Sequence, residues 1–190
     1  MNTSHSSVLQ LDIQGTPQSW LTLEQAAVHV ATGAVAWSLG DRPLARLRGG
    51  QQLATGRQSV IEVPPIIALA GGSRVNLFRL APCYTRAKLM RRDRLSCAYC
   101  GQRFAPQQLS ADHIRPQSRG GPWHWMNLVT ACQPCNRRKA DRTPEEAGMP
   151  LLYLPYVPSR FEDFLLQGRS IRGDVHAWLA ARLPRHSRLN

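Results

Sequence analysis

The chain has 190 residues, and 24 Lys and Arg residues against 12 Asp and Glu residues give it a formal net charge of +12. This length allows one or two domains with a buried core, and an apolar fraction of 43% is ordinary for a globular protein. The positive charge favours a polyanionic partner such as nucleic acid, because neutralised phosphates release counterions. No apolar run reaches membrane-spanning length and no basic amphipathic stretch favours a membrane surface.

Residues 1–7 are polar and lack the basic start and apolar centre of a signal peptide. Four of the five cysteines lie in closely spaced pairs that suit a metal ion better than secretion-type disulfides. These two features predict a cytoplasmic protein. The fifth cysteine, Cys83, stands outside the pairs and is expected to be a buried free thiol.

Residues 1–90 are expected to form a small α+β module. Apolar alternation predicts a strand over 8–13, and the capping-box pattern that starts at Thr22 predicts a helix over 23–34. Residues 41–56 are rich in Arg, Gly and Gln and are expected to form a hairpin or a mobile loop. Further short apolar stretches follow the predicted helix: 35–39, 59–63, 66–70 and 74–80. A scaffold, a DNA-groove contact and an oligomer contact are all compatible with this module, and we favour scaffold plus DNA contact.

Two Cys-x-x-Cys pairs, Cys97 with Cys100 and Cys132 with Cys135, are separated by 31 residues. Each pair brings two thiolates close enough to share a metal ion, and four thiolates suit tetrahedral zinc. Such a site has no open position, which makes the zinc structural and places any chemistry elsewhere. A disulfide pair and a redox-active pair are the alternatives.

The segment between the cysteine pairs predicts a strand over 109–114 that ends in an Asp-His step. A loop rich in Pro, Gly and Ser covers 115–126, and a second strand covers 127–131. Helix-forming residues then run from Cys135 with no breaker before Pro144. The order of elements is therefore strand, strand, helix.

These residues resemble the HNH endonucleases of the four-cysteine, zinc-containing type with a ββα-metal core. The resemblance covers roughly 91–149. It rests on three motifs: Cys-x-x-Cys-Gly, Asp-His-Ile-x-Pro-x-Ser-x-Gly-Gly and Trp-x-Asn-Leu-Val-x-Ala-Cys-x-x-Cys-Asn-x-x-Lys.

The resemblance implies a role for each matching residue. His113 would be the general base that activates water, and Asn127 would bond the backbone near it to orient the ring. Asp112 and Asn136 would hold one Mg²⁺ or Mn²⁺ ion through hard oxygen ligands. Asn136 stands where the family often has His, which leaves the metal preference open. The side chains expected on phosphates are Arg115, Arg119, Arg137, Arg138 and Lys139.

Each of these residues also has a purely structural interpretation. His113 by itself is compatible with a surface or core histidine, Asn127 with a turn residue, and Asn136 with a residue that satisfies a helix end. Trp123 and Trp125 are expected to pack under the loop that precedes the second strand. A wedge against a DNA groove is the alternative for this tryptophan pair.

The C-terminal part is expected to be helical. Thr143 followed by proline predicts a short helix, and a capping box predicts another from Ser159 to Glu162 onward. Asp174 is expected to cap a last helix. The fold class is therefore α+β, with an N-terminal α+β module (1–90), a zinc-containing ββα-metal nuclease core (91–150) and a helical C-terminal extension (151–190).

Together these expectations describe a metal-dependent endonuclease acting on double-stranded DNA, in restriction, phage defence or mobile-element biology. A homo-oligomer or a protein partner is compatible with the sequence. The alternative, from a different functional class, is a non-catalytic zinc-dependent nucleic-acid-binding or accessory module, for example in phage packaging.

Overall fold

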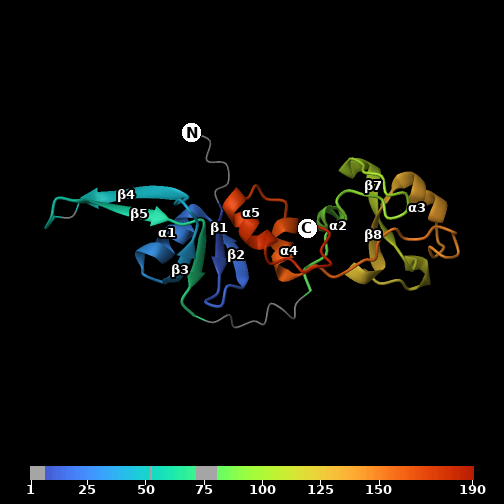
Figure 1. Cartoon of the computed structure of the whole chain (residues 1–190), viewed down its shortest axis with the longest axis horizontal. Helices are drawn as coiled ribbons and strands as arrows, with labels where there is room; N and C mark the ends of the chain where they lie inside the picture. Colours follow the sequence, from blue (N-terminus) through green and yellow to red (C-terminus); the bar gives the residue numbers. More distant parts are fainter. Residues whose placement is uncertain (1–6, 52, 72–80) are drawn as a thin grey trace. The chain divides into compact units, whose positions relative to one another are not determined.

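The computed structural model describes residues 7–51, 53–71 and 81–190 and has an α+β fold (Figure 1). By contacts it divides into two compact units, which are described separately below. Unit 1 comprises Met1–Arg79 and Arg169–Ala181, and unit 2 comprises Leu80–Gly168 and Arg182–Asn190. Residues 151–190, expected as one helical extension, are thus shared between the two units, and the three-segment division stays a prediction.

Unit 1 contains a four-stranded sheet in the order β2-β1-β6-β3. β1 pairs in parallel with β6, whereas the pairs β1–β2 and β3–β6 are antiparallel. The strands are β1 (Val8–Leu11), β2 (Pro17–Leu21), β3 (Val35–Leu39) and β6 (Ile66–Leu69). Helix α1 (Leu23–Ala31) begins at the predicted capping box, and one buried apolar cluster consists of Val8, Leu21, Ala26, Val63 and Ile67.

Two features of unit 1 differ from expectation. β2 was not predicted, because Pro17 suggested a break; the proline instead opens an edge strand, where no partner needs its missing N–H. In α5 (Gly173–Ala180) the N-cap is Arg172, and Asp174 lies inside the first turn rather than capping the helix. The apolar stretch expected at 74–80 lies outside the described residues.

The segment rich in Arg, Gly and Gln forms an antiparallel ribbon of β4 (Ala45–Gln51) and β5 (Gln58–Val63), as one of the two expectations had it (Figure 1). Leu47 and Ile61 face each other in the register and pack against the core of unit 1. The base of the ribbon is therefore fixed to the unit by apolar packing.

Unit 2 is built on the predicted ββα arrangement. β7 (Leu109–His113) pairs antiparallel with β8 (Leu128–Cys132), so that His113 lies opposite Leu128, and α3 (Gln133–Lys139) follows directly. Short 3₁₀ turns precede or connect the strands: η2 (Pro106–Gln108), η3 (Gln117–Arg119) and η4 (Trp125–Asn127). The pairing brings the end of β7 and the start of β8 to one edge, where the Asp-His step lies.

A fully buried arginine fastens this arrangement. Helix α2 (Arg86–Arg92), which was not predicted, ends at Arg92, whose guanidinium pairs with Asp93 at 2.8 Å; both side chains are 0% exposed. The guanidinium also donates to the carbonyls of Trp125 and Leu128 at 3.0 and 2.8 Å, and Asp93 accepts the N–H of Thr130 at 2.8 Å. Arg92 and Asp93 thereby bond β8 and the loop before it to α2.

The C-terminal residues of unit 2 pack around α4 (Arg160–Leu166), which starts at the predicted capping box of Ser159 and Glu162. Glu162 is 0% exposed and accepts a hydrogen bond from the hydroxyl of Ser187 at 2.6 Å. The helix predicted from Thr143 is wrong: residues 143–148 form only a turn, although Thr143 and Glu146 do exchange the two capping bonds. Within the described part of the chain, every helix is too short or too polar to cross a membrane.

Candidate active site and metal centre

The four paired cysteines come together as the sequence predicts. The sulfur atoms of Cys97, Cys100, Cys132 and Cys135 all lie within 4.8 Å of one another. All four are free thiols, so neither pair forms a disulfide. Gly101 has φ +74° just after the first pair, a conformation that glycine adopts without strain, and Cys132 is the N-cap residue of α3. Four thiolates at this spacing fit a structural zinc ion that would join the α2–β7 loop to β8 and α3. Cys83, expected to be buried, is exposed.

A second group of polar side chains lines a cavity of about 300 Å³ at the end of β7. Asp112 and His113 reach it from β7, and Asn136 reaches it from α3. The remaining lining residues are Ala111, Pro116, Gln117, Ser118, Lys139, Ala140 and Asp141. Three of the four predicted catalytic residues therefore lie around one cavity, and that cavity contains no cysteine.

Asp112 is held on both carboxylate oxygens. It is only 5% exposed; its Oδ1 accepts from the ammonium of Lys139 at 3.0 Å, and its Oδ2 accepts from the hydroxyl of Tyr99. The pKa of Tyr99 is raised mainly by burial and further by the nearby Asp112 carboxylate. The phenol therefore stays protonated and donates a hydrogen bond to Asp112. Tyr99 lies inside the first Cys-x-x-Cys pair. The cysteine cluster and the Asp-His step are therefore linked through one tyrosine side chain.

His113 lies against an aromatic side chain. Its ring forms a T-shaped pair with Trp123, with the centroids 4.4 Å apart. The Nε2 atom is buried and has no hydrogen-bond partner among the described residues. Burial lowers the pKa of the His113 imidazole below its usual value, an effect that Asp112 opposes and Lys139 reinforces. The imidazole is therefore held in its neutral, proton-accepting form.

Asn127 fastens the loop that follows β7. Its Oδ1 accepts the N–H of Arg115 at 2.9 Å, and its Nδ2 donates to the carbonyls of Arg115 and Pro122 at 3.2 and 3.0 Å. Gly121 packs so close to Arg115 that an added Cβ would collide with the Arg115 carbonyl. Asn127 thus bonds the backbone two residues beyond His113, and it is not among the residues that line the cavity.

Asn136 points from α3 toward β7. Its Nδ2 donates to the hydroxyl of Ser110 at 2.8 Å. No described residue donates to its Oδ1, which is therefore open to another ligand. Ser110 precedes Asp112 by two positions on β7, and alternate residues of a strand share a face. The two candidate ligands Asp112 and Asn136 are thus positioned by the same strand.

The five basic residues expected on phosphates fall into different environments. Arg115, Arg137 and Arg138 are exposed. Arg119 is exposed too, but it pairs with Glu146 at 2.7 Å. Lys139 is 1% exposed, and besides Asp112 it bonds the carbonyl of His113 at 2.9 Å. The expectation of a phosphate contact by Lys139 is therefore corrected, because its ammonium is enclosed beneath the cavity.

Sequence reasoning missed Tyr99 altogether, and it assigned Lys139 to phosphate rather than to Asp112. For Lys139 a signal was present: it follows Asn136 by three residues in a helix, which places both on one face. Tyr99 carried no comparable signal, because the partner of a residue between two cysteines depends on how the loop that holds Cys97 and Cys100 packs against β7.

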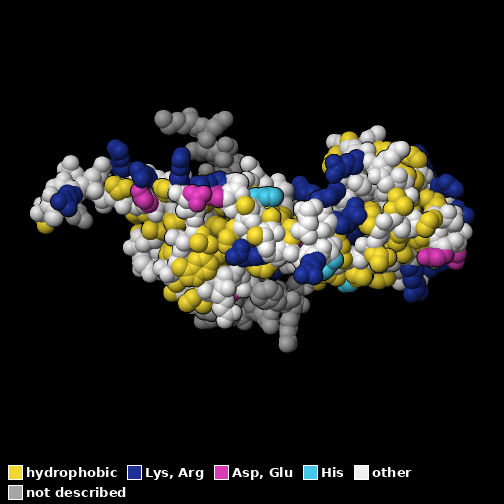
Figure 2. Space-filling model, viewed as in Figure 1, with side chains coloured by type: hydrophobic (Ala, Val, Ile, Leu, Met, Phe, Trp, Pro, Cys, Tyr) yellow, Lys and Arg dark blue, Asp and Glu magenta, His cyan; other side chains and the backbone are white. Residues whose placement is uncertain are grey.

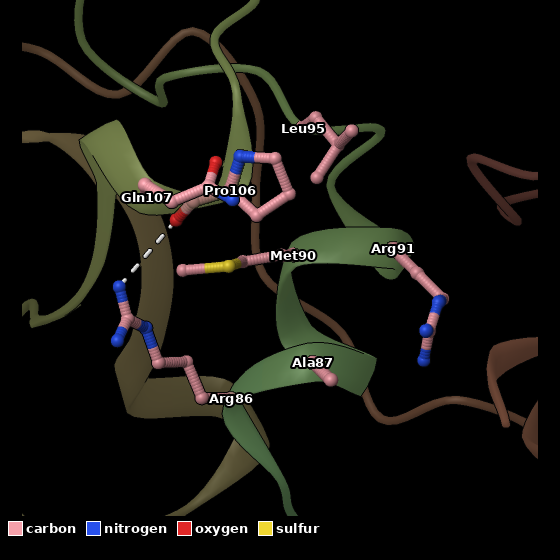
Figure 3. A pocket seen from close by; sticks show the side chains of 7 residues that line it. All are labelled: Arg86, Ala87, Met90, Arg91, Leu95, Pro106 and Gln107. Atoms are coloured by element: carbon pink, nitrogen blue, oxygen red, sulfur yellow. Dashed lines mark hydrogen bonds between the residues drawn. The ribbon is translucent and has the colours of Figure 1, made fainter. Parts of the chain in front are cut away.

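A larger cavity of about 510 Å³ lies at α2, and it shares no lining residue with the smaller cavity (Figure 3). Met90 and Ala87 of α2, with Leu95 and Pro106, give it apolar walls, and Arg86 lies at its side. Arg86 donates to the carbonyl of Leu109 at the start of β7. No acid, histidine or cysteine lines this cavity, so it lacks the side chains that acid–base chemistry needs.

Comparison with known proteins points in the same direction for the central segment. Residues 97–152 match the family model described as HNH endonuclease. A search of curated proteins gives no match. Among solved structures, the Type II-C Cas9 enzyme from Actinomyces naeslundii is similar at 23% identity, covering 50% of this chain and 11% of that chain with a TM-score of 0.30. This chain thus corresponds to about a tenth of that protein's length, and the structural likeness is too low to carry an argument.

Proposed function

Because residues 97–152 match the HNH endonuclease family model, we propose that the protein is a divalent-metal-dependent endonuclease that hydrolyses phosphodiester bonds in double-stranded DNA. The observation that supports this most strongly is the convergence of Asp112, His113 and Asn136 on one cavity beside a four-cysteine cluster. A binding protein would need none of these three polar groups around a common cavity.

In this proposal His113 takes a proton from the attacking water. Its ring is held in place by the T-shaped contact with Trp123. The lowered pKa keeps the ring neutral. Asn127 holds the backbone of Arg115, which fixes the chain that follows the base.

The donor set around the cavity fits a hard divalent cation. Asn136 has an unoccupied amide oxygen, and each oxygen of Asp112 has accepted only one hydrogen bond and keeps further lone pairs. When bound there, Mg²⁺ or Mn²⁺ would supply stabilisation of the negative charge that develops on the phosphate and the leaving oxygen. Lys139 and Tyr99 would hold the Asp112 carboxylate in one orientation.

The substrate would be held by positive side chains outside the cavity. Arg137 and Arg138 are exposed on α3, the helix that carries Asn136, and Arg115 is exposed on the loop that Asn127 bonds. Guanidinium groups suit phosphate oxygens, because they donate several hydrogen bonds in a fixed planar fork. We therefore assign backbone contacts to these three arginines, with Arg119 contributing only if its pair with Glu146 opens.

The test is cleavage of supercoiled plasmid by the purified full chain, with and without Mg²⁺ or Mn²⁺. We expect metal-dependent nicking that falls by about 10²–10⁴-fold in His113→Ala. His124→Ala is the matched control, since His124 is an exposed histidine in the nearby loop and does not line the cavity. Equal cleavage by His113→Ala and wild type would overturn the assignment of the general base.

A non-catalytic zinc-dependent accessory module is the second candidate. One observation favours it: both oxygens of Asp112 already have donors within the protein, so the carboxylate is satisfied without a metal ion. The plasmid assay separates the two functions. DNA binding without cleavage by the wild-type protein under any metal condition would favour the accessory module.

A further inference from the structure

The outer part of the β4–β5 ribbon is exposed to solvent along its described residues. All described residues from 48 to 51 and from 53 to 60 are exposed, whereas Leu47 and Ile61, one pair nearer the base, are partly buried against the core of unit 1. A two-stranded hairpin without a packing face is marginally stable in water. This part of the ribbon therefore adds no core to its unit, and its residues are available to a partner.

The charge of this segment has one sign. Residues 48–60 contain two arginines, Arg48 and Arg57, and no acidic residue. Neither guanidinium is paired with a carboxylate in the described part of the chain. Arg46 differs from them, because two pairs nearer the base than Arg48 it forms an ion pair with Glu62 at 2.8 Å. In Figure 2 the outermost part of the ribbon shows basic and uncharged side chains and no acidic one on the face in view. The unneutralised charge thus lies beyond Arg46.

The ribbon is also slender. Between the pairs Arg48–Val60 and Gln51–Gln58, β4 has two residues, Gly49 and Gly50, and β5 has one, Ser59. This mismatch is a β-bulge. Ser59 closes the bulge by donating to the carbonyl of Gly50 at 3.2 Å, and an added Cβ at Gly49 would collide with the Ser59 side chain. The strands therefore approach closely, with little side-chain bulk between Arg48 and the tip.

These dimensions match a DNA groove. Three residue steps of β4 from Arg48 to Gln51 span roughly 10 Å at the rise of a β-strand. The major groove, about 12 Å wide, admits a two-stranded ribbon. Gln51 and Gln58 face each other across the ribbon, and glutamine amides can bond base edges in that groove. Positive charge, lack of packing and small cross-section thus all suit a negatively charged groove.

We propose that the outer β4–β5 ribbon, residues 48–60, is an arm that binds a groove of double-stranded DNA, with Arg48 and Arg57 on the phosphates. The proposal rests on the proposed function for the kind of nucleic acid, but it concerns a surface outside the catalytic cavity. It gives unit 1 a part in substrate binding that the family match at residues 97–152 does not assign.

The test measures binding and cleavage separately. Binding of a fluorescent DNA duplex is followed by anisotropy at several salt concentrations, with His113→Ala as the background so that the duplex stays intact. In the double variant R48Q/R57Q we expect the slope of log affinity against log salt to fall by about 1.8, since each phosphate contact contributes about 0.9. At 0.1 M salt this corresponds to roughly 10- to 100-fold weaker binding.

The control is R46Q/E62Q, which removes the ion-paired residues of the same ribbon and leaves the net charge unchanged. We expect its salt slope to equal that of the parent protein. A second variant replaces residues 48–60 by Asn-Gly, so that a tight hairpin turn joins the paired residues Leu47 and Ile61 and both arginines are removed. It should keep the thermal unfolding temperature of the parent, because the removed residues do not pack, and bind DNA as weakly as R48Q/R57Q.

The outcomes separate this inference from the proposed function. Suppose that the wild type cuts DNA, and that R48Q/R57Q and the variant with the shortened ribbon bind it with an unchanged salt slope. Then the proposed DNA-binding arm is wrong, and the proposed nuclease function is unaffected. If the wild type does not cut but the variants lose slope, the arm stands without the nuclease. Because Leu53 is fully exposed, a protein contact is the competing occupant. If Leu53→Ser forms a smaller oligomer than the wild type and binds DNA equally well, the ribbon is a protein contact and the proposed DNA-binding arm is wrong.

Discussion

The ββα core and the outer β4–β5 ribbon place polar side chains under opposite constraints. In the core, Asp112 and Lys139 are almost completely buried and bonded to each other. In the ribbon, Arg48 and Arg57 are exposed and lack ionic partners among the described residues. Chemistry at a single phosphorus atom requires groups held in advance, because misplacement by an ångström costs rate. Contacts along a charged backbone tolerate mobile side chains. Polar residues of the core should therefore be more sensitive to substitution of a neighbouring residue than polar residues of the ribbon.

The largest effect should come from removing the metal of the four-cysteine cluster. Cys97→Ser is expected to unfold the ββα core, because structural zinc contributes on the order of 10 kcal/mol to folding. Metal analysis and hydrogen exchange would show zinc lost and protection gone from β7 and β8, with protection kept in the β1–β6 sheet. Cys83→Ser, which changes an exposed cysteine outside the cluster, is the control. A zinc-free Cys97→Ser protein with full protection in β7 would contradict the structural site.

The next largest effect should follow from Arg92, whose charge is fully buried. Arg92→Met leaves Asp93 uncompensated and is expected to cost about 3–5 kcal/mol of unfolding free energy. Urea denaturation measures this loss. The double variant Arg92→Met with Asp93→Asn should be less destabilised than the sum of the two single variants, because they share one interaction. Additive losses would show that the pair does not act as a unit.

A smaller effect is expected where the cysteine cluster meets the cavity. Tyr99→Phe removes the hydroxyl that bonds Asp112 and should lower cleavage by about 10–100-fold at limiting Mg²⁺, since partners of metal ligands have effects of this size. More Mg²⁺ should restore part of the rate, with zinc content unchanged. Tyr153→Phe is the control, because that hydroxyl bonds the carbonyl of Ser96 instead. Equal metal dependence in Tyr99→Phe and wild type would rule out a positioning role.

The smallest effect should be a shift in pH dependence. Burial lowers the pKa of His113, so the neutral base persists to lower pH than for an ordinary histidine. Trp123→Ala removes the ring that packs on His113, lets water reach it and should raise this pKa. The acid limb of the pH–cleavage profile should then move to higher pH, with little change in rate on the alkaline side. A movement toward lower pH would contradict burial as the cause.

Local patterns in the sequence were sufficient to predict the framework of the site. β7, β8 and α3 follow from short apolar runs, a loop rich in Pro and Gly, and the spacing of the second cysteine pair. The capping boxes at Thr22 and Ser159 were equally local and were both confirmed. Asp112, His113 and Asn136 were grouped by the resemblance to HNH endonucleases, and all three line one cavity.

What could not be predicted depends on contacts between distant segments. Arg92 appears as one of several arginines in a basic run, and only its carbonyl partners Trp125, Leu128 and Tyr156 explain its burial. Lys139 was grouped with Arg137 and Arg138 by charge, although helical geometry turns it to the opposite side. A local pattern was also insufficient at Thr143, where the capping bonds form but no following turn propagates a helix.

The order in which the chain visits the two units has a consequence for its synthesis. Residues 169–181 return to unit 1 after unit 2 has begun, and residues 182–190 return to unit 2. Neither unit is a continuous stretch of chain, so unit 1 lacks α5 until residue 181 has left the ribosome. Unit 2 likewise lacks the Ser187 hydroxyl for Glu162 until the following residues emerge. A nascent chain halted at residue 168 would therefore carry two incomplete folding units, and each unit would be completed only when its own part of residues 169–190 emerges.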